Sequence, residues 1–316
     1  MDRALKAADL VDAVMAHLEE YTFTERARVG AEALRGRLAA RAYDALTVAQ
    51  MCDRVNEDLA AAVGDRHLRL IWHDEPMQPP DASDESGAVA ELRETFRVEN
   101  QGIRRVERLA GNIGLIELTL IPPAATSGAA IAAAMTLVSN TEALLLDLRD
   151  TRGGAPDGVA LWCSFLLADG DTHLSDIIEG NAAPRQYWTS AYLPSPRYLD
   201  RPIWVLTSRS TFSGGEGLAY DLQALGRVTV VGEVTRGGAH PVEVVQLTPH
   251  VELRVPVART VNPITGGDWE GVGVQPDIAT SAGDAFAVAF GAASDYVPAV
   301  RHTDGGEGNG TSRRIR

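Results

Sequence analysis

The chain has 316 residues, 45% hydrophobic and 6% aromatic, which is the composition of a folded globular protein rather than a disordered one. Its formal net charge is -14 and Lys6 is its only lysine, so the clustered positive charge that nucleic-acid binding requires is missing. Cys52 and Cys163 are too few for a disulfide framework, and no Cys, His, Asp or Glu residues have metal-site spacing, so we expect neither a nucleic-acid partner nor a metal or other cofactor.

Residues 1–75 are predicted to form a small bundle of three helices. Apolar residues recur at intervals of three and four between residues 5 and 63, as on the buried face of an amphipathic helix. Thr47 and Gln50 have the spacing of a capping box, which marks the start of the third helix. Charged residues interrupt every apolar stretch near the start of the chain. We therefore expect no signal peptide, no membrane span and a cytoplasmic location.

Residues 76–92 are predicted to form a linker, because they are acidic, rich in Pro and Ser, and without periodicity. From residue 93 to residue 298, short apolar runs of strand length alternate with helical stretches, which indicates an α/β domain. Within it, residues 242–259 alternate like an antiparallel hairpin. The tail, residues 299–316, has no apolar periodicity and is expected to be disordered.

A candidate nucleophile lies where a buried strand meets a helix. Ser213 follows the apolar segment of residues 202–208 and directly precedes a helix that begins with Gly214, which is the setting that an exposed nucleophile needs. The N–H of Gly214, at the start of the helix, is a candidate donor to an oxyanion. Gly153 and Gly154 follow another buried strand and are candidates for the second donor.

Both features also have a purely structural interpretation. Ser213 with Glu216 three residues later has the pattern of a capping box, which stabilises a helix by about 1 kcal/mol and needs no catalytic role. The pair Gly153 and Gly154 is equally typical of a turn. The residues alone leave both interpretations open.

Several segments together resemble the C-terminal processing (tail-specific) serine peptidases, most closely the modules of interphotoreceptor retinoid-binding protein and its bacterial relatives. The segments are LAAAVGDRHLRL, LLLDLRDTRGG, THLSDI, LTSRSTFSGGEGLAYDLQALGRVTVVGEVTRGGAHP and WEGVGVQPDI. The resemblance implies a crotonase-like β/β/α core preceded by a small helical bundle. Because residues 73–104 are too few to hold the PDZ domain of many relatives, we expect this member to lack it.

The resemblance also indicates which residue activates Ser213. The bacterial and chloroplast enzymes use a lysine, but the matching position here is Gly238, and the only lysine lies in the first helix, so a Ser-Lys dyad is excluded. Relatives of the tricorn type use a histidine and a glutamate, which match His67 and Glu270. The resemblance thus implies a triad in which His67 takes the Ser213 proton and Glu270 orients the imidazole.

One departure from the tricorn pattern places a demand on the geometry. The residue before the histidine is a serine in that pattern and Arg66 here, so His67 and Glu270 must be in direct contact. His240, in a glycine-rich turn, is the rival base. The structural alternatives are that His67 is a solvent-exposed turn histidine and that Glu270 is one of many surface acids.

The expected function is that of a serine peptidase or acyl hydrolase, working through an acyl-enzyme on a peptide or small acyl substrate. The alternative is a non-catalytic module for a hydrophobic, retinoid-like or lipid-like ligand, because the retinoid-binding relatives have the same fold. A third possibility is an enzyme that cyclises or releases a metabolite by the same acyl chemistry. The sequence gives no indication of the oligomeric state.

Overall fold

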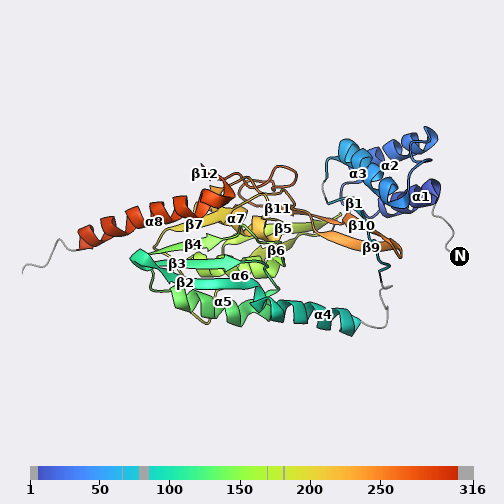
Figure 1. The fold of residues 1–316 in the computed structure, drawn as a ribbon. Helices are drawn as coiled ribbons and strands as arrows, with labels where there is room; N and C mark the ends of the chain where they lie inside the picture. Colours follow the sequence, from blue (N-terminus) through green and yellow to red (C-terminus); the bar gives the residue numbers. More distant parts are fainter. Residues whose placement is uncertain (1–5, 66, 78–84, 169, 181, 305–316) are drawn as a thin grey trace, which may run out of the picture.

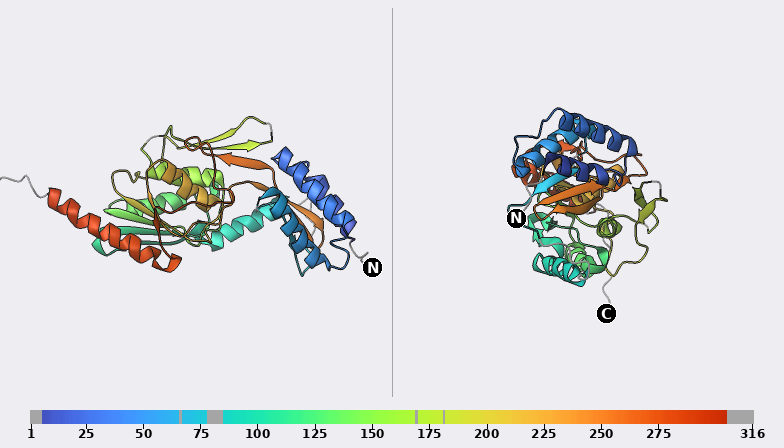
Figure 2. Two further views of the ribbon diagram at one scale, coloured as in Figure 1. Left: turned by 90° about the horizontal axis from the view of Figure 1, so that it is seen from above. Right: turned by 90° about the vertical axis from the view of Figure 1, so that its right-hand side faces the viewer.

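A computed structural model gives the fold, and it describes residues 6–65, 67–77, 85–168, 170–180 and 182–304. The molecule is elongated, with the N-terminal helices at one end and the last helix at the other (Figures 1 and 2). Between them lies a core of sheet and helices. No helix among the described residues is long and apolar enough to cross a bilayer.

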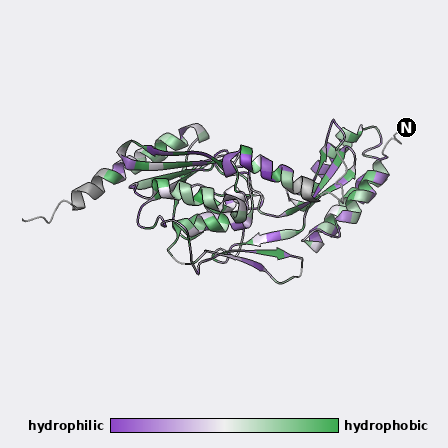
Figure 3. Ribbon diagram, turned by 90° about the horizontal axis from the view of Figure 1, so that it is seen from below, coloured by the Kyte–Doolittle hydropathy of each residue, from purple (hydrophilic) through white to green (hydrophobic). Residues whose placement is uncertain are grey.

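Three helices form the N-terminal unit, as predicted: α1 (Ala7–His17), α2 (Thr24–Ala39) and α3 (Val48–Val63). The predicted capping box starts α3, where the hydroxyl of Thr47 accepts a hydrogen bond from the N–H of Gln50 at 3.3 Å. Green and purple alternate along these helices in Figure 3, as expected for amphipathic helices with one apolar face.

A three-stranded sheet completes the N-terminal unit, and two of its strands come from late in the chain. β1 (Arg69–Trp72) pairs antiparallel with β10 (Val251–Pro256), which pairs with β9 (Val242–Thr248). Leu253 and its apolar neighbours in β10 pack in one cluster with the three helices. The predicted hairpin is therefore present, but it packs with the N-terminal helices rather than with the core assigned to residues 93–298. The local periodicity of a strand does not show which distant segment it pairs with.

The core is built on a six-stranded sheet of order β12-β8-β7-β4-β3-β2. Every neighbouring pair is parallel except β2 and β3. The two central strands β4 and β7 are buried along their whole length, which explains their continuous apolar sequences. The strands are β2 (Ile103–Leu109), β3 (Ile113–Leu118), β4 (Ala143–Asp147), β7 (Ile203–Thr207), β8 (Thr229–Gly232) and β12 (Ile278–Ala279).

Helices cover both faces of this sheet. On one face, α5 (Ala124–Val138), α6 (Pro156–Leu166) and α7 (Gly214–Ala224) share one apolar cluster with the strands. On the other face, α8 (Ala282–Asp304) packs its alanines against side chains such as Leu145. The core is thus the mixed α/β fold that the sequence predicted.

A third, smaller sheet of order β11-β5-β6 supplies one wall of the pocket described below. Its strands are β5 (His173–Glu179), β6 (Arg185–Trp188) and β11 (Ala258–Val261), and both pairs are antiparallel. Single-turn 3-10 helices, η1 (Asn100–Gly102) and η2 (Ala110–Asn112), stand before and after β2 in the large sheet.

Two of the predicted boundaries need correction. Helix α4 (Glu85–Val98) begins inside the segment predicted as a linker, residues 76–92. Its run of Glu, Ala, Leu and Arg favours a helix, and this local preference outweighs the composition of the segment as a whole. Helix α8 continues to Asp304, so the tail predicted from residue 299 begins too early. The remaining parts of those predictions, at residues 78–84 and 305–316, lie outside the described residues.

Candidate active site

Ser213 lies in a strained turn between β7 and α7. Its φ of 51° and ψ of -119° fall in a region that residues with a side chain rarely occupy. The predicted capping box is formed by Ser213 and Glu216, but an ordinary N-cap residue has an extended backbone, so capping alone does not explain this conformation. The turn follows the carboxyl end of a central parallel strand, where the binding sites of such sheets form. A half-buried serine in this conformation is typical of a nucleophile.

Glu216 fixes the Ser213 turn from within the protein. Its side chain is fully buried. Its carboxylate accepts hydrogen bonds from the N–H groups of Ser213 at 2.7 Å, Gly237 at 2.6 Å and Gly238 at 2.9 Å, and from the Thr235 hydroxyl at 2.5 Å. Burial raises the pKa of Glu216, although these donors act in the opposite direction. The Ser-x-x-Glu pattern thus ties the Ser213 turn to a second loop, a role that its capping-box spacing did not reveal.

The glycines predicted to stabilise an oxyanion lie together beside Ser213. A Cβ added to Gly153, whose φ is 120°, would lie 2.9 Å from the Ser213 Cβ, and one added to Gly214 would lie 2.8 Å from the Gly154 carbonyl oxygen. Only glycine permits such close approaches. Gly154 and Gly214 both line the pocket next to Ser213, and within the described chain neither N–H donates a hydrogen bond to another main-chain group.

His67 and Glu270 are in contact, although they come from distant parts of the chain. Nδ1 of His67 lies 3.2 Å from Oε2 of Glu270, and each side chain is 8% exposed. The same oxygen accepts a hydrogen bond from the N–H of Ala239 at 2.6 Å, which fixes the carboxylate. The direct contact that Arg66 makes necessary is therefore present; Arg66 itself lies outside the described residues. Nδ1 of His67 faces Glu270, and among the described residues no hydrogen bond joins the His67 ring to Ser213.

The ring of His67 also lies against Gly238, the position that the sequence resemblance matched to a lysine. It packs on Phe212, the neighbour of Ser213, with ring centroids 5.2 Å apart. A Cβ added to Gly238 would overlap Phe212 and lie 2.6 Å from Cε1 of His67. Any side chain at this position would displace one of the two rings. A lysine side chain at position 238 and the ring of His67 would therefore compete for the same space.

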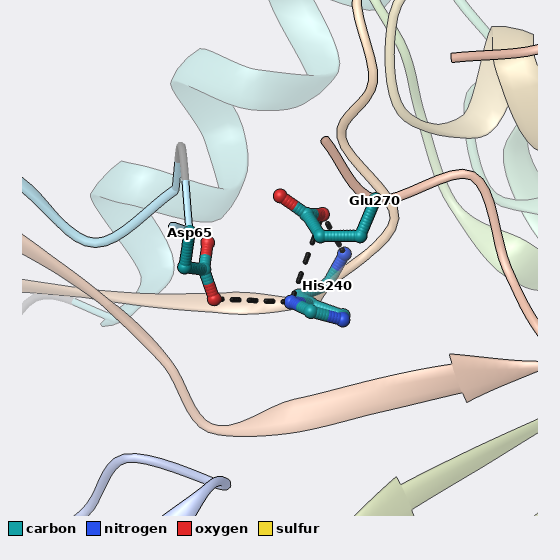
Figure 4. A group of neighbouring side chains, drawn as sticks. All are labelled: Asp65, His240 and Glu270. Carbon is teal, nitrogen blue, oxygen red and sulfur yellow. Dashed lines mark hydrogen bonds and ion pairs between the residues drawn. The ribbon is translucent and has the colours of Figure 1, made fainter. Parts of the chain in front are cut away.

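His240, the rival base, is held by carboxylates at both ring nitrogens. Its Nδ1 lies 3.1 Å from Asp65 and 3.6 Å from Glu270, and its Nε2 lies 3.6 Å from Asp268. Figure 4 shows the ring between Asp65 and Glu270. Burial disfavours the charged ring, but hydrogen bonds to Asp268 and Asp65 and the charge of Glu270 outweigh it and raise the pKa of His240 to about 9. An imidazole already protonated at neutral pH cannot accept a proton from a serine, so we interpret His240 as a structural cation.

Asp65 connects the two histidines and was missed in the sequence. Its Oδ1 accepts a hydrogen bond from the N–H of His67 at 2.9 Å, and its Oδ2 accepts one from the Tyr21 hydroxyl at 2.9 Å and pairs with His240. Burial acts against ionisation, but these partners lower the pKa of Asp65. Its place two residues before His67 was the available signal.

The same group is the one cluster among the described residues with the geometry of a metal site. Ligand atoms of Asp65, His240 and Glu270 lie within 4.8 Å of one another. A divalent cation would have to displace the proton of His240, which already neutralises the carboxylates around it. Ion pairing therefore accounts for the cluster without a metal.

The raised pKa of His240 predicts how stability changes with pH. The group has an ordinary pKa of 6.5 and a folded-state pKa of about 9, so its contribution is complete below 6.5 and is lost as the pH rises through 9. We expect the free energy of unfolding in urea to fall by a few kcal/mol between pH 6.5 and pH 9.5. The fall in the free energy of unfolding should be much smaller in His240→Ala than in the wild type. In the control His173→Ala it should be as large as in the wild type. An equal fall in wild type and His240→Ala would contradict the assignment.

A pocket of about 130 Å³ opens beside Ser213. It lies between α6, α7, the small sheet and the loop that carries Trp269, whose indole N–H donates to the Gly238 carbonyl at 2.9 Å. The walls are mostly small or apolar, with Val159 and Ile177 among them. The pocket is thus placed to hold a side chain of a substrate whose carbonyl lies at Ser213.

Ser213 thus lies in a strained turn at the carboxyl edge of a parallel sheet, and a histidine and a glutamate in contact lie beside that turn, which is an arrangement typical of hydrolases. Residues 112–280, more than half of the chain, match the model of peptidase family S41, and the chain belongs to this family. The matched segment contains Ser213, Glu270 and the glycines beside them, whereas His67 precedes it.

Known proteins show the same relationship. The chain is 32% identical over 166 residues to carboxyl-terminal-processing peptidase 2, chloroplastic, of Arabidopsis thaliana, a match that covers 52% of this chain and 31% of that protein's length. A crystal structure from Parabacteroides merdae assigned to the peptidases has a TM-score of 0.66 at 18% identity, covering 92% of this chain and 97% of its own. The photosystem II D1 C-terminal processing protease has a TM-score of 0.53 at 16% identity, covering 88% and 94%. These structural likenesses establish the fold.

Proposed function

We propose that the chain is a serine peptidase or acyl hydrolase in which Ser213 attacks the carbonyl carbon of a peptide or small acyl substrate. The observation that carries the proposal is the contact between His67 Nδ1 and Glu270 Oε2 at 3.2 Å, next to the Ser213 turn. Membership of peptidase family S41 supports the reaction type. The single lysine, Lys6, belongs to the N-terminal region and leaves the basic role to a histidine.

In the proposed reaction, Nε2 of His67 accepts the proton of the Ser213 hydroxyl as Oγ bonds to the carbonyl carbon. The N–H groups of Gly154 and Gly214 stabilise the resulting oxyanion. The protonated His67 then donates its proton to the leaving amine, and the acyl-enzyme remains. Water, deprotonated by His67, then attacks the acyl carbon, and the protonated His67 returns this proton to Oγ as the bond between Oγ and the acyl carbon breaks. Glu270 stabilises the imidazolium in both halves of the cycle.

The finer relationships inferred from the sequence belong to this proposal as well. We infer a tricorn-like use of histidine and glutamate on a crotonase-like core of the interphotoreceptor retinoid-binding protein branch. The direct contact of His67 with Glu270 supports the first point. The described part of residues 73–104 contains α4 and the start of β2, which supports the inferred lack of a PDZ domain.

The pocket favours catalysis over the alternative of a carrier for a hydrophobic ligand. Sites for small molecules usually enclose about 300 to 1,000 Å³, whereas the pocket beside Ser213 has a volume of about 130 Å³. This volume suits one amino-acid side chain and is small for a retinoid. A carrier also has no chemical need for a strained serine next to a histidine and a glutamate in contact.

A fluorophosphonate probe tests the proposal, because only an activated serine reacts with it quickly. We expect rapid labelling of the wild-type protein and none of Ser213→Ala. Ser210→Ala removes an exposed hydroxyl three residues away and serves as the control, which should be labelled like the wild type. A folded wild type that stays unlabelled, or equal labelling of Ser213→Ala, would refute the proposal.

A further inference from the structure

The pocket beside Ser213 contains a buried carboxyl group in its lining. Gly214, Gly217 and Asp221 all line it, and their spacing of three and four residues places them on one face of α7. The two glycines let other groups approach the helix closely, since a Cβ at Gly214 would lie 2.8 Å from the Gly154 carbonyl oxygen and one at Gly217 would lie 3.1 Å from the Trp269 ring. Asp221 follows Ser213 by eight positions, which is about 12 Å along a helix.

Asp221 keeps one carboxylate oxygen without a protein partner. The residue is 2% exposed, and its Oδ1 accepts a hydrogen bond from Nδ2 of Asn262 at 2.9 Å. Asn262 is itself fixed, because it also donates to the carbonyl of Leu174 at 3.2 Å and accepts from the N–H of Ile264 at 2.9 Å. Oδ2 of Asp221 has no hydrogen bond to the described residues. It keeps a small accessible surface, and this surface faces the pocket that Asp221 lines.

No cation of the described residues compensates this carboxyl group. Burial raises the pKa of Asp221 to about 7, and the only opposing influence is the hydrogen bond from Asn262. The other titratable neighbour is the thiol of Cys163 on α6, whose pKa is raised by burial and then by the charge of Asp221. A buried acid without a positive partner is unfavourable, and a guest that supplies the positive charge relieves this cost.

We propose that this pocket selects a lysine or arginine side chain at the substrate residue whose carbonyl is attacked, with its cationic end bound to Oδ2 of Asp221. The inference rests on the proposed function, because the pocket begins at Ser213. The apolar stem of such a side chain can pack between Val159 and Trp269, which both line the pocket. An acidic side chain is repelled, and a short apolar one leaves Asp221 unpaired.

The test is a series of peptidyl aminomethylcoumarin substrates that differ only in the residue before the scissile bond: Lys, Arg, Ala, Leu or Glu. We expect the wild-type kcat/KM for Lys or Arg to exceed that for Ala by about 100-fold, because the site contains a group that only a cation satisfies. In Asp221→Asn, which retains the shape of the side chain, this ratio should fall close to one. Both kcat/KM values in a ratio are measured on the same enzyme sample. A smaller fraction of folded enzyme in a variant lowers both values equally and leaves their ratio unchanged.

The exposed Asp295 on α8 provides the matched control, because Asp295→Asn removes the same charge far along the chain and should keep the wild-type ratio. Equal cleavage of the Ala and Lys substrates by the wild type, or an unchanged preference in Asp221→Asn, would overturn the inference. Failure of the proposed function is separate, since it appears as absent fluorophosphonate labelling. In that case n-butylammonium provides the test: it should raise the Tm of the wild type and not of Asp221→Asn, and no shift in either overturns the inference.

Discussion

Replacing His67 by alanine is expected to lower kcat/KM for peptide hydrolysis by a factor of about 10³, because a general base of this kind contributes that much to acyl transfer. The reason lies in the contacts of the ring. Glu270 lies at Nδ1, and Phe212 and Gly238 confine the imidazole, so no other group can take its place without a rearrangement. The measurement is steady-state hydrolysis of a fluorogenic peptide, with fluorophosphonate labelling as a second readout.

His173→Ala is the matched control for this experiment. His173 also pairs with a carboxylate, Asp176 at 2.8 Å, but its ring stacks on Trp188, whereas the ring of His67 packs on Phe212 next to Ser213. Its variant should retain wild-type kcat/KM. If His67→Ala kept full activity while Ser213→Ala lost it, a different base would have to be sought. His67→Gln, which preserves much of the volume, should be as inactive as His67→Ala, because an amide does not accept the serine proton.

Removing Glu216 should have the largest effect on stability. Glu216→Ala leaves the N–H groups of Ser213, Gly237 and Gly238 and the Thr235 hydroxyl without their acceptor in a buried site. Leaving one buried donor without its acceptor costs about 1 to 3 kcal/mol, so the loss of these four bonds should cost several kcal/mol. We expect a fall of this size in the free energy of unfolding, measured with urea, together with loss of fluorophosphonate labelling.

The control for Glu216 is Glu243, which is exposed in β9. Glu243→Ala should change the free energy of unfolding by no more than about 0.5 kcal/mol. Glu216→Gln separates shape from charge: it fills the same space but turns an amide N–H₂ toward main-chain donors, so it should also be strongly destabilising. A Glu216→Gln protein with wild-type stability would show that the network is not needed to hold the turn.

Local patterns in the sequence were sufficient for the elements that carry the site. The apolar runs predict the buried strands β4 and β7, and the glycines after them mark the turns that meet at the carboxyl edge of the sheet. Ser213 with Glu216 was readable as a capping box, which the structure contains, but the strained φ of the serine has no sequence signature.

Residues that act through long-range contacts were harder to predict. His67 entered only through the family resemblance, because nothing in its neighbourhood distinguishes it from a turn histidine. Asp65 and Asp268, which hold His240 as a cation, and Asp221 in the pocket look like ordinary acids in the sequence. Their importance comes from burial and from partners far along the chain, and neither is encoded in periodicity or spacing. The pairing of β1 with β10 was hidden for the same reason.

The sheet that joins β1 to β10 affects when the protein can become active during synthesis. His67 is made early, whereas its partner Glu270 and the hairpin that anchors its unit are made late. When Ser213 has emerged from the ribosome but Glu270 has not yet been made, the chain still lacks the carboxylate that orients His67. In the proposed mechanism, the emerging polypeptide has no competent proteolytic centre until the segment that carries Glu270 has been made and has folded against His67.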